Sequence, residues 1–219
     1  MKKELIFLGP PACGKGTQTD KLSKYLNLPH IDTGSLLRAE IAKETKEGLI
    51  AKSFIDKGQL VPIDLVATII GKKLADEDCL NGYVLDGYPR SLEQAEKLDI
   101  INQEIDKNND NVSFKAIYFD IDTDILIERI VNRQSCPVCG EIYNKKFKPS
   151  KVENICDKCN VQLKTRDDDT AEVAQKRFDT YYEQTAPLVE FYKNKGVLYK
   201  LDANGSIEEV WARLLKIVE

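Results

Sequence analysis

Residues 9–17 constrain the fold of this chain more than any other part of the sequence. They have the pattern G-x-x-x-x-G-K, followed directly by glycine and threonine. A short apolar run at residues 4–8 precedes them, and apolar residues at helical spacing follow over 15–26. An apolar run that stops at glycine is typical of a central parallel strand. The sequence therefore predicts a buried strand, a tight glycine turn and a helix, in that order.

This strand–turn–helix context is the one that a phosphate-binding P-loop requires. Backbone N–H groups at the helix N-terminus bind phosphate oxygens, and the Lys15 ammonium adds a positive charge beside them. The usual pattern has Ser or Thr directly after the lysine, whereas here Gly16 intervenes before Thr17. An ordinary glycine-rich turn is the alternative. The joint presence of strand, glycines, lysine and threonine favours a nucleoside triphosphate site.

The rest of the chain alternates between predicted strands and helices. Besides residues 4–8, strands are predicted at 83–86, 116–121 and 197–201, and helices at 63–76, 125–133, 171–194 and 206–217. Residues 34–57 have the pattern of two helices with a break near Gly48, and 106–111 form a polar loop. Such alternation predicts βαβ units and hence a parallel sheet with right-handed crossovers. A length of 219 residues fits one α/β unit with small insertions.

Four of the six cysteines form two C-x-x-C pairs with sixteen residues between them: Cys136, Cys139, Cys156 and Cys159. This spacing matches a tetrahedral zinc ribbon. The N-terminal apolar run is too short for a signal peptide, which favours a bound metal over disulfides. Because four protein ligands leave no open coordination position, the zinc is predicted to be structural.

Charge and hydropathy restrict the partners of the chain. The net charge is −4, whereas a protein that binds nucleic acid normally has a basic balance. No apolar run approaches the roughly 20 residues that span a bilayer, so no membrane partner is predicted. The default location is the cytoplasm.

Four motifs occur in order along almost the whole chain. They are the Gly-Lys-Gly-Thr end of the glycine loop, Thr33-Gly34 with Arg38, Asp86-Gly87-Tyr88-Pro89-Arg90 with Gln94, and Arg166-Asp167-Asp168-Asp169 with Arg177. This combination resembles the adenylate kinase family in its zinc-containing form with a long lid. The resemblance implies an α/β P-loop three-layer fold, with a parallel five-stranded sheet flanked by helices. The expected state is a monomer.

The resemblance also divides the chain into a core and two insertions. The P-loop core would comprise residues 1–31, 62–131 and 170–219. Residues 32–61 would form the AMP-binding subdomain and 132–169 the zinc-binding lid. A metal crosslink can stabilise an insertion that is too small to bury much core. Such a lid would move as one body and exclude water on closure.

The implied activity is reversible, Mg²⁺-dependent transfer of the terminal phosphoryl group of ATP to AMP, which gives two ADP. Such a reaction depends mostly on positioning and charge stabilisation. The acceptor phosphate has a second pKa of about 6, so it needs no general base at pH 7. The single histidine, His30, is accordingly expected to be structural. Several cations are needed instead, and arginine forks match phosphate oxygens.

The resemblance assigns roles by position. The catalytic group would be Lys15, Asp86, Arg90, Arg133, Arg166 and Arg177, with Asp86 orienting Mg²⁺ through waters. ATP would contact Ala12, Cys13, Gly14, Lys15, Gly16, Thr17, Arg133, Ile142, Tyr143 and Gly205. AMP would contact Thr33, Arg38, Gln59, Leu60, Val61, Gly87, Tyr88, Pro89, Arg90, Gln94, Arg166 and Arg177, with Gln94 on the adenine edge.

Three features depart from the family pattern. Ala12 stands where glycine is common, and a positive φ there would cost alanine about 1 kcal/mol and distort the phosphate loop. Ser35 replaces an acidic residue that often follows Thr-Gly, which removes a charged partner. The loop at 102–113 is expected to be longer than usual.

Several alternatives remain open at this stage. Asp167, Asp168 and Asp169 could serve only to cap a helix N-terminus. The acceptor could be GMP, UMP or CMP, and the donor could be GTP. A zinc-ribbon protein that binds nucleic acid, with a regulatory nucleotide site, is the alternative from another class.

Overall fold

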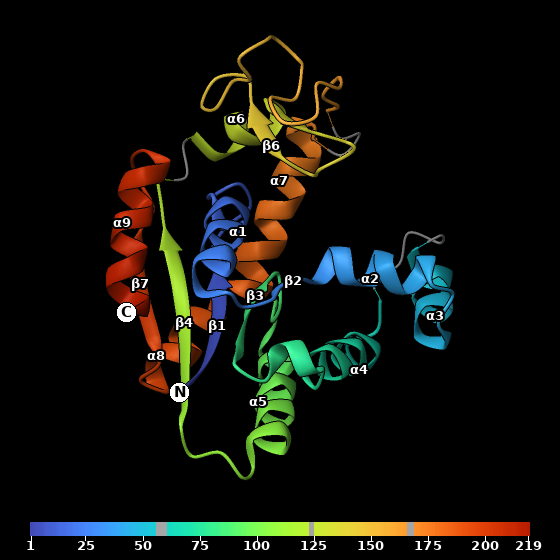
Figure 1. The fold of residues 1–219 in the computed structure, drawn as a ribbon, viewed down its shortest axis with the longest axis vertical. Coiled ribbons are helices and arrows are strands. Elements are labelled where there is room, and N and C mark those ends of the chain that lie inside the picture. The colour runs from blue at the N-terminus through green and yellow to red at the C-terminus, as the bar shows by residue number, and fades with distance from the viewer. Residues whose placement is uncertain (56–60, 123–124, 166–168) are drawn as a thin grey trace.

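The computed structural model describes residues 1–55, 61–122, 125–165 and 169–219. A parallel sheet with helices on both faces forms the body of the molecule (Figure 1). Its strands are β1 (Lys2–Leu8), β2 (His30–Asp32), β3 (Gly82–Asp86), β4 (Val112–Asp120) and β7 (Leu198–Asp202). Their order across the sheet is β2-β3-β1-β4-β7, and every neighbouring pair is parallel. The predicted fold class is confirmed.

The helices cover both faces of this sheet and extend beyond it. They are α1 (Lys15–Leu26), α2 (Thr33–Ala42), α3 (Lys46–Ile55), α4 (Ile63–Leu74), α5 (Leu92–Asp106), α6 (Leu126–Val131), α7 (Ala171–Thr180), α8 (Pro187–Asn194) and α9 (Ile207–Val218). Helices α2 and α3 project from one side of the sheet (Figure 1). The antiparallel pair β5 (Arg133–Ser135) and β6 (Ile142–Asn144) lies at the end of α7 that points away from the sheet.

Side chains of β1 alternate between two hydrophobic cores. Leu5 and Phe7 pack in a cluster with residues of α1, α6, α7 and α9, whereas Ile6 and Leu8 pack with residues of α4, α5 and α8. A parallel strand that is covered on both faces needs apolar residues at successive positions, which the sequence of β1 supplies. None of the described helices combines the length and the apolar character that crossing a bilayer requires.

Local signals place the ends of several helices where the sequence predicts them. Helix α1 has the predicted bounds, because Gly14 precedes it and Asn27 ends it in a left-handed conformation. Helix α9 begins after Ser206, whose side chain forms a capping box with Glu209. The predicted helix at 171–194 consists of α7, a π-helical turn at Tyr181–Thr185, and α8.

The predicted break near Gly48 is wrong, because Gly48 lies inside α3. The chain turns earlier, after Ala42, and the Thr45 hydroxyl accepts from Gly48 N at 3.0 Å at the start of α3. A Cβ atom at position 48 would lie 2.2 Å from the carbonyl oxygen of Glu40. The glycine therefore permits contact between the backbones of two helices instead of ending one.

Two other expectations need correction at the ends of elements, and one short strand has no counterpart among the predicted elements. The loop expected at 102–113 is shorter than predicted, because α5 extends to Asp106 and β4 already begins at Val112. The helix predicted at 125–133 ends at Val131, since Arg133 begins β5. The sequence does not predict the edge strand β2, because three residues carry no periodicity that could identify a strand.

An ionic cluster is buried at the amino end of the sheet. Lys2 Nζ lies 2.9 Å from Glu4 Oε1 and 2.8 Å from Asp106 Oδ1. Only 2% of Glu4 is exposed. Burial raises the pKa of Glu4 to about 7, and the Lys2 ammonium opposes this rise. Between about pH 4.5 and 7, the folded chain therefore holds a proton that the unfolded chain has lost.

We predict that Glu4→Gln removes part of the pH dependence of stability. Protonated Glu4 stabilises the fold fully below its unfolded pKa, and this stabilisation is lost as the pH rises through about 7. The free energy of unfolding of the variant, relative to wild type, should increase by on the order of 2 kcal/mol between pH 5 and pH 8.5. Urea denaturation at each pH measures this difference. Glu172→Gln, at an exposed ion pair, is the control, and parallel pH curves for Glu4→Gln and wild type would contradict the prediction.

Candidate active site

The glycine loop connects the carboxyl end of β1 to α1. Gly9 lies against β4, where a Cβ atom would approach Cβ of Phe119 to 2.9 Å. Lys15 Nζ folds back over the loop and donates to the carbonyl oxygens of Gly9 at 2.6 Å and Pro10 at 3.2 Å. The loop thus holds an ammonium group beside the N-terminus of α1. Backbone N–H groups and a cation together form an arrangement that binds phosphate.

Ala12 adopts a left-handed backbone conformation, with φ of 61°. This is the condition under which the sequence predicts strain for alanine at this position. The carbonyl of Ala12 accepts a hydrogen bond from Arg129 Nη1 at 3.5 Å, and the Arg129 guanidinium lies 5.4 Å from the centre of the Phe147 ring. Arg129 therefore links the glycine loop to the segment that contains the cysteine pairs, and sequence analysis did not identify it.

Asp86 ends β3 beside the glycine loop. In the parallel register it faces Phe7 of β1 on one side and Asp32 of β2 on the other. Its Oδ2 atom lies 3.5 Å from Thr19 Oγ1 and 4.0 Å from His30 Nε2. Burial raises the pKa of the Asp86 carboxyl above its ordinary value, and the positive charge of Lys15 opposes that rise. Carboxylate oxygens are hard ligands of the kind that Mg²⁺ prefers, so Asp86 fits the ion that accompanies ATP.

The loop that follows β3 gathers several of the predicted AMP residues. Arg90 Nε donates to the carbonyl of Gly87 at 2.7 Å, and Arg90 N donates to Gln94 Oε1 at 2.7 Å. Thr33 Oγ1 donates to the carbonyl of Asp86 at 3.4 Å. A Cβ atom at Gly87 would lie 3.0 Å from Arg90 Nη2 and 3.6 Å from Thr33 Oγ1. Two segments that are separate in sequence, the start of α2 and the loop after β3, therefore meet at one point of the sheet edge.

The remaining predicted AMP residues lie in different surroundings. The Tyr88 ring is buried in the core, so only its backbone is available at the loop that it shares with Pro89. Val61 packs at the edge of the same core. The predicted contacts at Gln59 and Leu60 lie outside the described residues.

Arg38 lies on α2, where most of its side chain is exposed. Its Nη2 donates to Ser35 Oγ at 2.8 Å and lies 3.7 Å from Asp32 Oδ2. Ser35 thus supplies an oxygen to the arginine in place of an acidic residue, and the neighbouring Asp32 supplies the carboxylate. Asp32 also caps α2 by accepting from Ser35 N at 2.7 Å.

A buried carboxylate joins two of the predicted catalytic arginines. Asp169 accepts from Arg133 through both oxygens, with Nε to Oδ2 at 2.8 Å, and Arg177 Nη1 lies 3.9 Å from its Oδ1. Asp169 does not cap α7, because the N-cap is Thr170, whose side chain accepts from Val173 N. The sequence alone does not reveal this contact between Asp169 and Arg133. Arg166, Asp167 and Asp168 lie outside the described residues.

The other predicted ATP residues lie on β6 and before α9, outside the glycine loop. Ile142 and Tyr143 lie on β6, and the Tyr143 side chain is buried. The Tyr143 hydroxyl lies 3.6 Å from Cys156 Sγ and accepts from Asp157 N, so a contact with nucleotide is left to its backbone. Gly205 precedes α9 with φ of 105°.

The four paired cysteines form one cluster. Their Sγ atoms all lie within 4.8 Å of one another, and none forms a disulfide. Cys139 and Cys156 have their sulfur atoms 3.7 Å apart. A tetrahedral zinc ion with Zn–S bonds of about 2.3 Å would separate its sulfur ligands by about 3.8 Å. The side chains of Cys136, Cys139, Cys156 and Cys159 are therefore positioned to bind a metal ion.

The fold and the glycine loop define a P-loop α/β protein with cationic side chains gathered near the loop. The adenylate kinase family model matches residues 7–197. The chain is 42% identical over 215 residues to the adenylate kinase of Lachnospira eligens, covering 98% of this chain and 99% of the relative. It is also 42% identical over 215 residues to the adenylate kinase of Archaeoglobus fulgidus, with coverage of 98% and 97%. It is 39% identical over 219 residues to the adenylate kinase of Thermotoga neapolitana, covering 100% of this chain and 98% of the relative. The chain belongs to the adenylate kinase family and is therefore a phosphotransferase.

We predict that Ala12→Gly increases the free energy of unfolding by about 0.5–1 kcal/mol. Relief of the left-handed strain gains about 1–2 kcal/mol, and the greater entropy of glycine in the unfolded chain offsets about 0.4–1 kcal/mol of this. Ala212→Gly, at an exposed site inside α9, is the control and should destabilise by about 1 kcal/mol. Urea denaturation of both variants measures the two effects, and an Ala12→Gly variant as destabilised as the control would show the prediction to be wrong.

Proposed function

We propose that the protein catalyses reversible transfer of the terminal phosphoryl group of ATP to AMP, with Mg²⁺ accompanying ATP. The observation that carries this proposal is the arrangement around Asp86. The glycine loop follows β1, the Thr33–Gly87–Arg90 group follows β2 and β3, and Asp86 lies between them on adjacent parallel strands. Two groups that suit phosphates are thus at the same edge of one sheet, as transfer between two nucleotides requires.

Phosphoryl transfer requires mainly that the protein position the two nucleotides and stabilise negative charge. An oxygen of AMP forms the new bond to the γ-phosphorus, and the bond to the β,γ-bridging oxygen breaks, leaving its electron pair on ADP. The AMP phosphate is already largely ionised at pH 7, since its second pKa is about 6. Lys15 would stabilise charge on the donor, and Arg90 would hold the acceptor. Arg133 and Arg177, with Arg166, would neutralise charge on the group in transfer.

The proposed nucleotide contacts follow the position of each segment. ATP would be bound by the glycine loop, Arg133, the backbone of β6 and the turn before α9: Ala12, Cys13, Gly14, Lys15, Gly16, Thr17, Arg133, Ile142, Tyr143 and Gly205. AMP would be bound by the segments around α2, the loop after β3 and the two further arginines: Thr33, Arg38, Gln59, Leu60, Val61, Gly87, Tyr88, Pro89, Arg90, Gln94, Arg166 and Arg177.

We also propose the division into a core and two insertions. Helices α2 and α3 stand apart from the sheet, and β5 and β6 lie at the far end of α7, which supports an AMP-binding subdomain at 32–61 and a lid at 132–169 (Figure 1). Closure of these parts over the nucleotides would exclude water, which otherwise competes with AMP as acceptor. A monomeric state and a cytoplasmic location stay predictions.

Both metals fit donor sets on this chain. The Asp86 carboxylate offers hard oxygen atoms beside the glycine loop, and Mg²⁺ held there through waters with ATP would neutralise phosphate charge. The four clustered thiols suit zinc, and because they fill all four positions the ion would be structural.

The lysines near the cysteine cluster weigh against the nucleic-acid alternative. Lys148 and Lys158 pair with Glu141, and Lys146 pairs with Glu128. These ion pairs reduce the positive charge that binding to a phosphate backbone would need.

A panel of nucleotides tests the proposed function. Purified protein with ATP and Mg²⁺ should convert AMP to ADP with kcat/KM about 100-fold or more above that for GMP, CMP or UMP, because a side chain that hydrogen-bonds a base edge discriminates strongly. Chromatography of the diphosphates measures the transfer. If the protein prefers another monophosphate, it is still a phosphotransferase, but AMP is not its main acceptor. Matched reactions with GTP in place of ATP test the donor.

Removal of zinc should destabilise the protein. We expect one zinc ion per chain, and a thermal midpoint that falls by on the order of 10 °C after chelation, which corresponds to about 3 kcal/mol. Cys156→Ser should lose the metal, whereas Cys79→Ser, which changes a buried cysteine outside the cluster, should retain it. Metal analysis and thermal denaturation measure both effects, and an unchanged midpoint after complete zinc removal would reject a structural role.

A further inference from the structure

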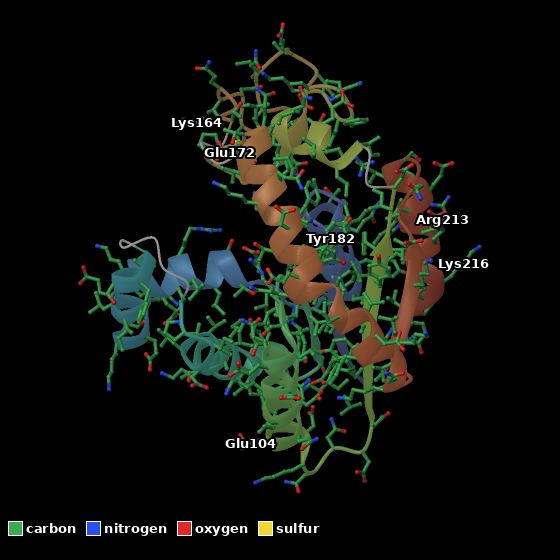
Figure 2. All side chains as sticks on the ribbon, turned by 180° about the vertical axis from the view of Figure 1, so that it is seen from behind. Glu104, Lys164, Glu172, Tyr182, Arg213 and Lys216 are labelled. Atoms are coloured by element: carbon green, nitrogen blue, oxygen red, sulfur yellow. The ribbon has the colours of Figure 1, made fainter. Side chains whose placement is uncertain are left out.

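A π-helical turn interrupts the helix that descends from the cysteine-containing segment into the core. It spans Tyr181–Thr185, between α7 and α8, and Ala186 N donates to the carbonyl of Tyr181 at 2.8 Å. Figure 2 shows Tyr182, which belongs to this turn, on the same helix as Glu172 and further toward the core. Single π-helical turns within α-helices frequently occur at functional sites, so the contacts of this turn bear on function.

Two threonines on this helix use their hydroxyl groups differently. Thr180 Oγ1 donates to the carbonyl of Lys176 at 2.9 Å, which is the usual contact of a helical threonine with its own preceding turn. Thr185, the last residue of the π-helical turn, donates instead to the carbonyl of Arg90 at 2.9 Å, across 95 residues of sequence. The hydroxyl of Thr185 therefore fixes another segment of the protein.

This contact completes a set of hydrogen bonds around Arg90. Arg90 N is held by Gln94 Oε1, and Arg90 Nε is held by the carbonyl of Gly87. Both of these partners belong to the loop itself or to α5, which follows it. The bond from Thr185 is different, because it connects the loop to the helix that also carries Arg177.

We propose that Thr185 is a positioning residue for phosphoryl transfer. Its hydroxyl fixes the main chain at Arg90, and so sets where the Arg90 guanidinium meets the acceptor phosphate. It also ties the acceptor side of the site to the helix of Arg177. The inference rests on the proposed function, since it assigns Arg90 to the acceptor AMP.

Kinetics of three variants test this role. Thr185→Val removes the hydroxyl at nearly constant volume, Thr185→Ser retains it, and Thr180→Val makes the same change where the bond stays within the helix. One hydrogen bond of ordinary strength corresponds to a change of about three- to tenfold. We therefore expect Thr185→Val to raise KM for AMP by about three- to tenfold, with KM for ATP within about twofold of wild type. Thr185→Ser should restore the wild-type KM for AMP, and Thr180→Val should leave it unchanged.

Other outcomes would overturn the inference. If Thr185→Val lowers the thermal midpoint but leaves KM for AMP unchanged, the hydroxyl has only a structural role. If KM for ATP and KM for AMP rise equally, or if Thr180→Val behaves like Thr185→Val, the effect is not specific to Arg90. A wild-type protein that transfers nothing to AMP would overturn the proposed function and this inference together, whereas the preceding outcomes reject the inference alone.

Discussion

Parallel hydrogen bonding of β1 to β3 and β4 is the constraint on which the site depends. Parallel strands end at the same edge of a sheet, so the register Phe7 to Asp86 places the glycine loop beside the loop that carries Arg90. Pairing of β2 with β3 then brings Thr33 to the same edge. Apolar residues on both faces of β1 maintain this register, because a slip of one residue would exchange the two hydrophobic cores.

Within the described residues, the cationic groups of the site are held by oxygen atoms of the protein. Lys15 donates to the carbonyl of Gly9, Arg90 donates to that of Gly87, and Arg133 forms an ion pair with the buried carboxylate of Asp169. In the proposed function, nucleotide phosphates would compete with these oxygens for the same N–H groups. Binding would then be an exchange of partners, with a net free energy smaller than the strength of each contact suggests.

The parts of the structure that follow from local signals could be predicted from sequence. The bounds of α1 could be predicted because the residues that set them, Gly14 at the start and Asn27 at the end, directly flank the helix in sequence. The position of Gly48 inside α3 could not be predicted, because the need for glycine there arises from the close approach of the Glu40 backbone in another helix. Asp169 has the same local signal as a helix cap, and only the folded chain brings Arg133 to it across 36 residues. Sequence therefore predicts the glycine loop and the cysteine cluster, and misses contacts that the tertiary fold creates.

The close approach at Gly48 has a mechanical consequence. Backbone touches backbone between α2 and α3 at this point, with no flexible side chain between them to be compressed. The two helices are therefore expected to act as one stiff unit. This unit joins the sheet at the boundary between β2 and α2, where Thr33 donates its hydroxyl to the backbone of Asp86, so a displacement of the unit would act directly on that contact.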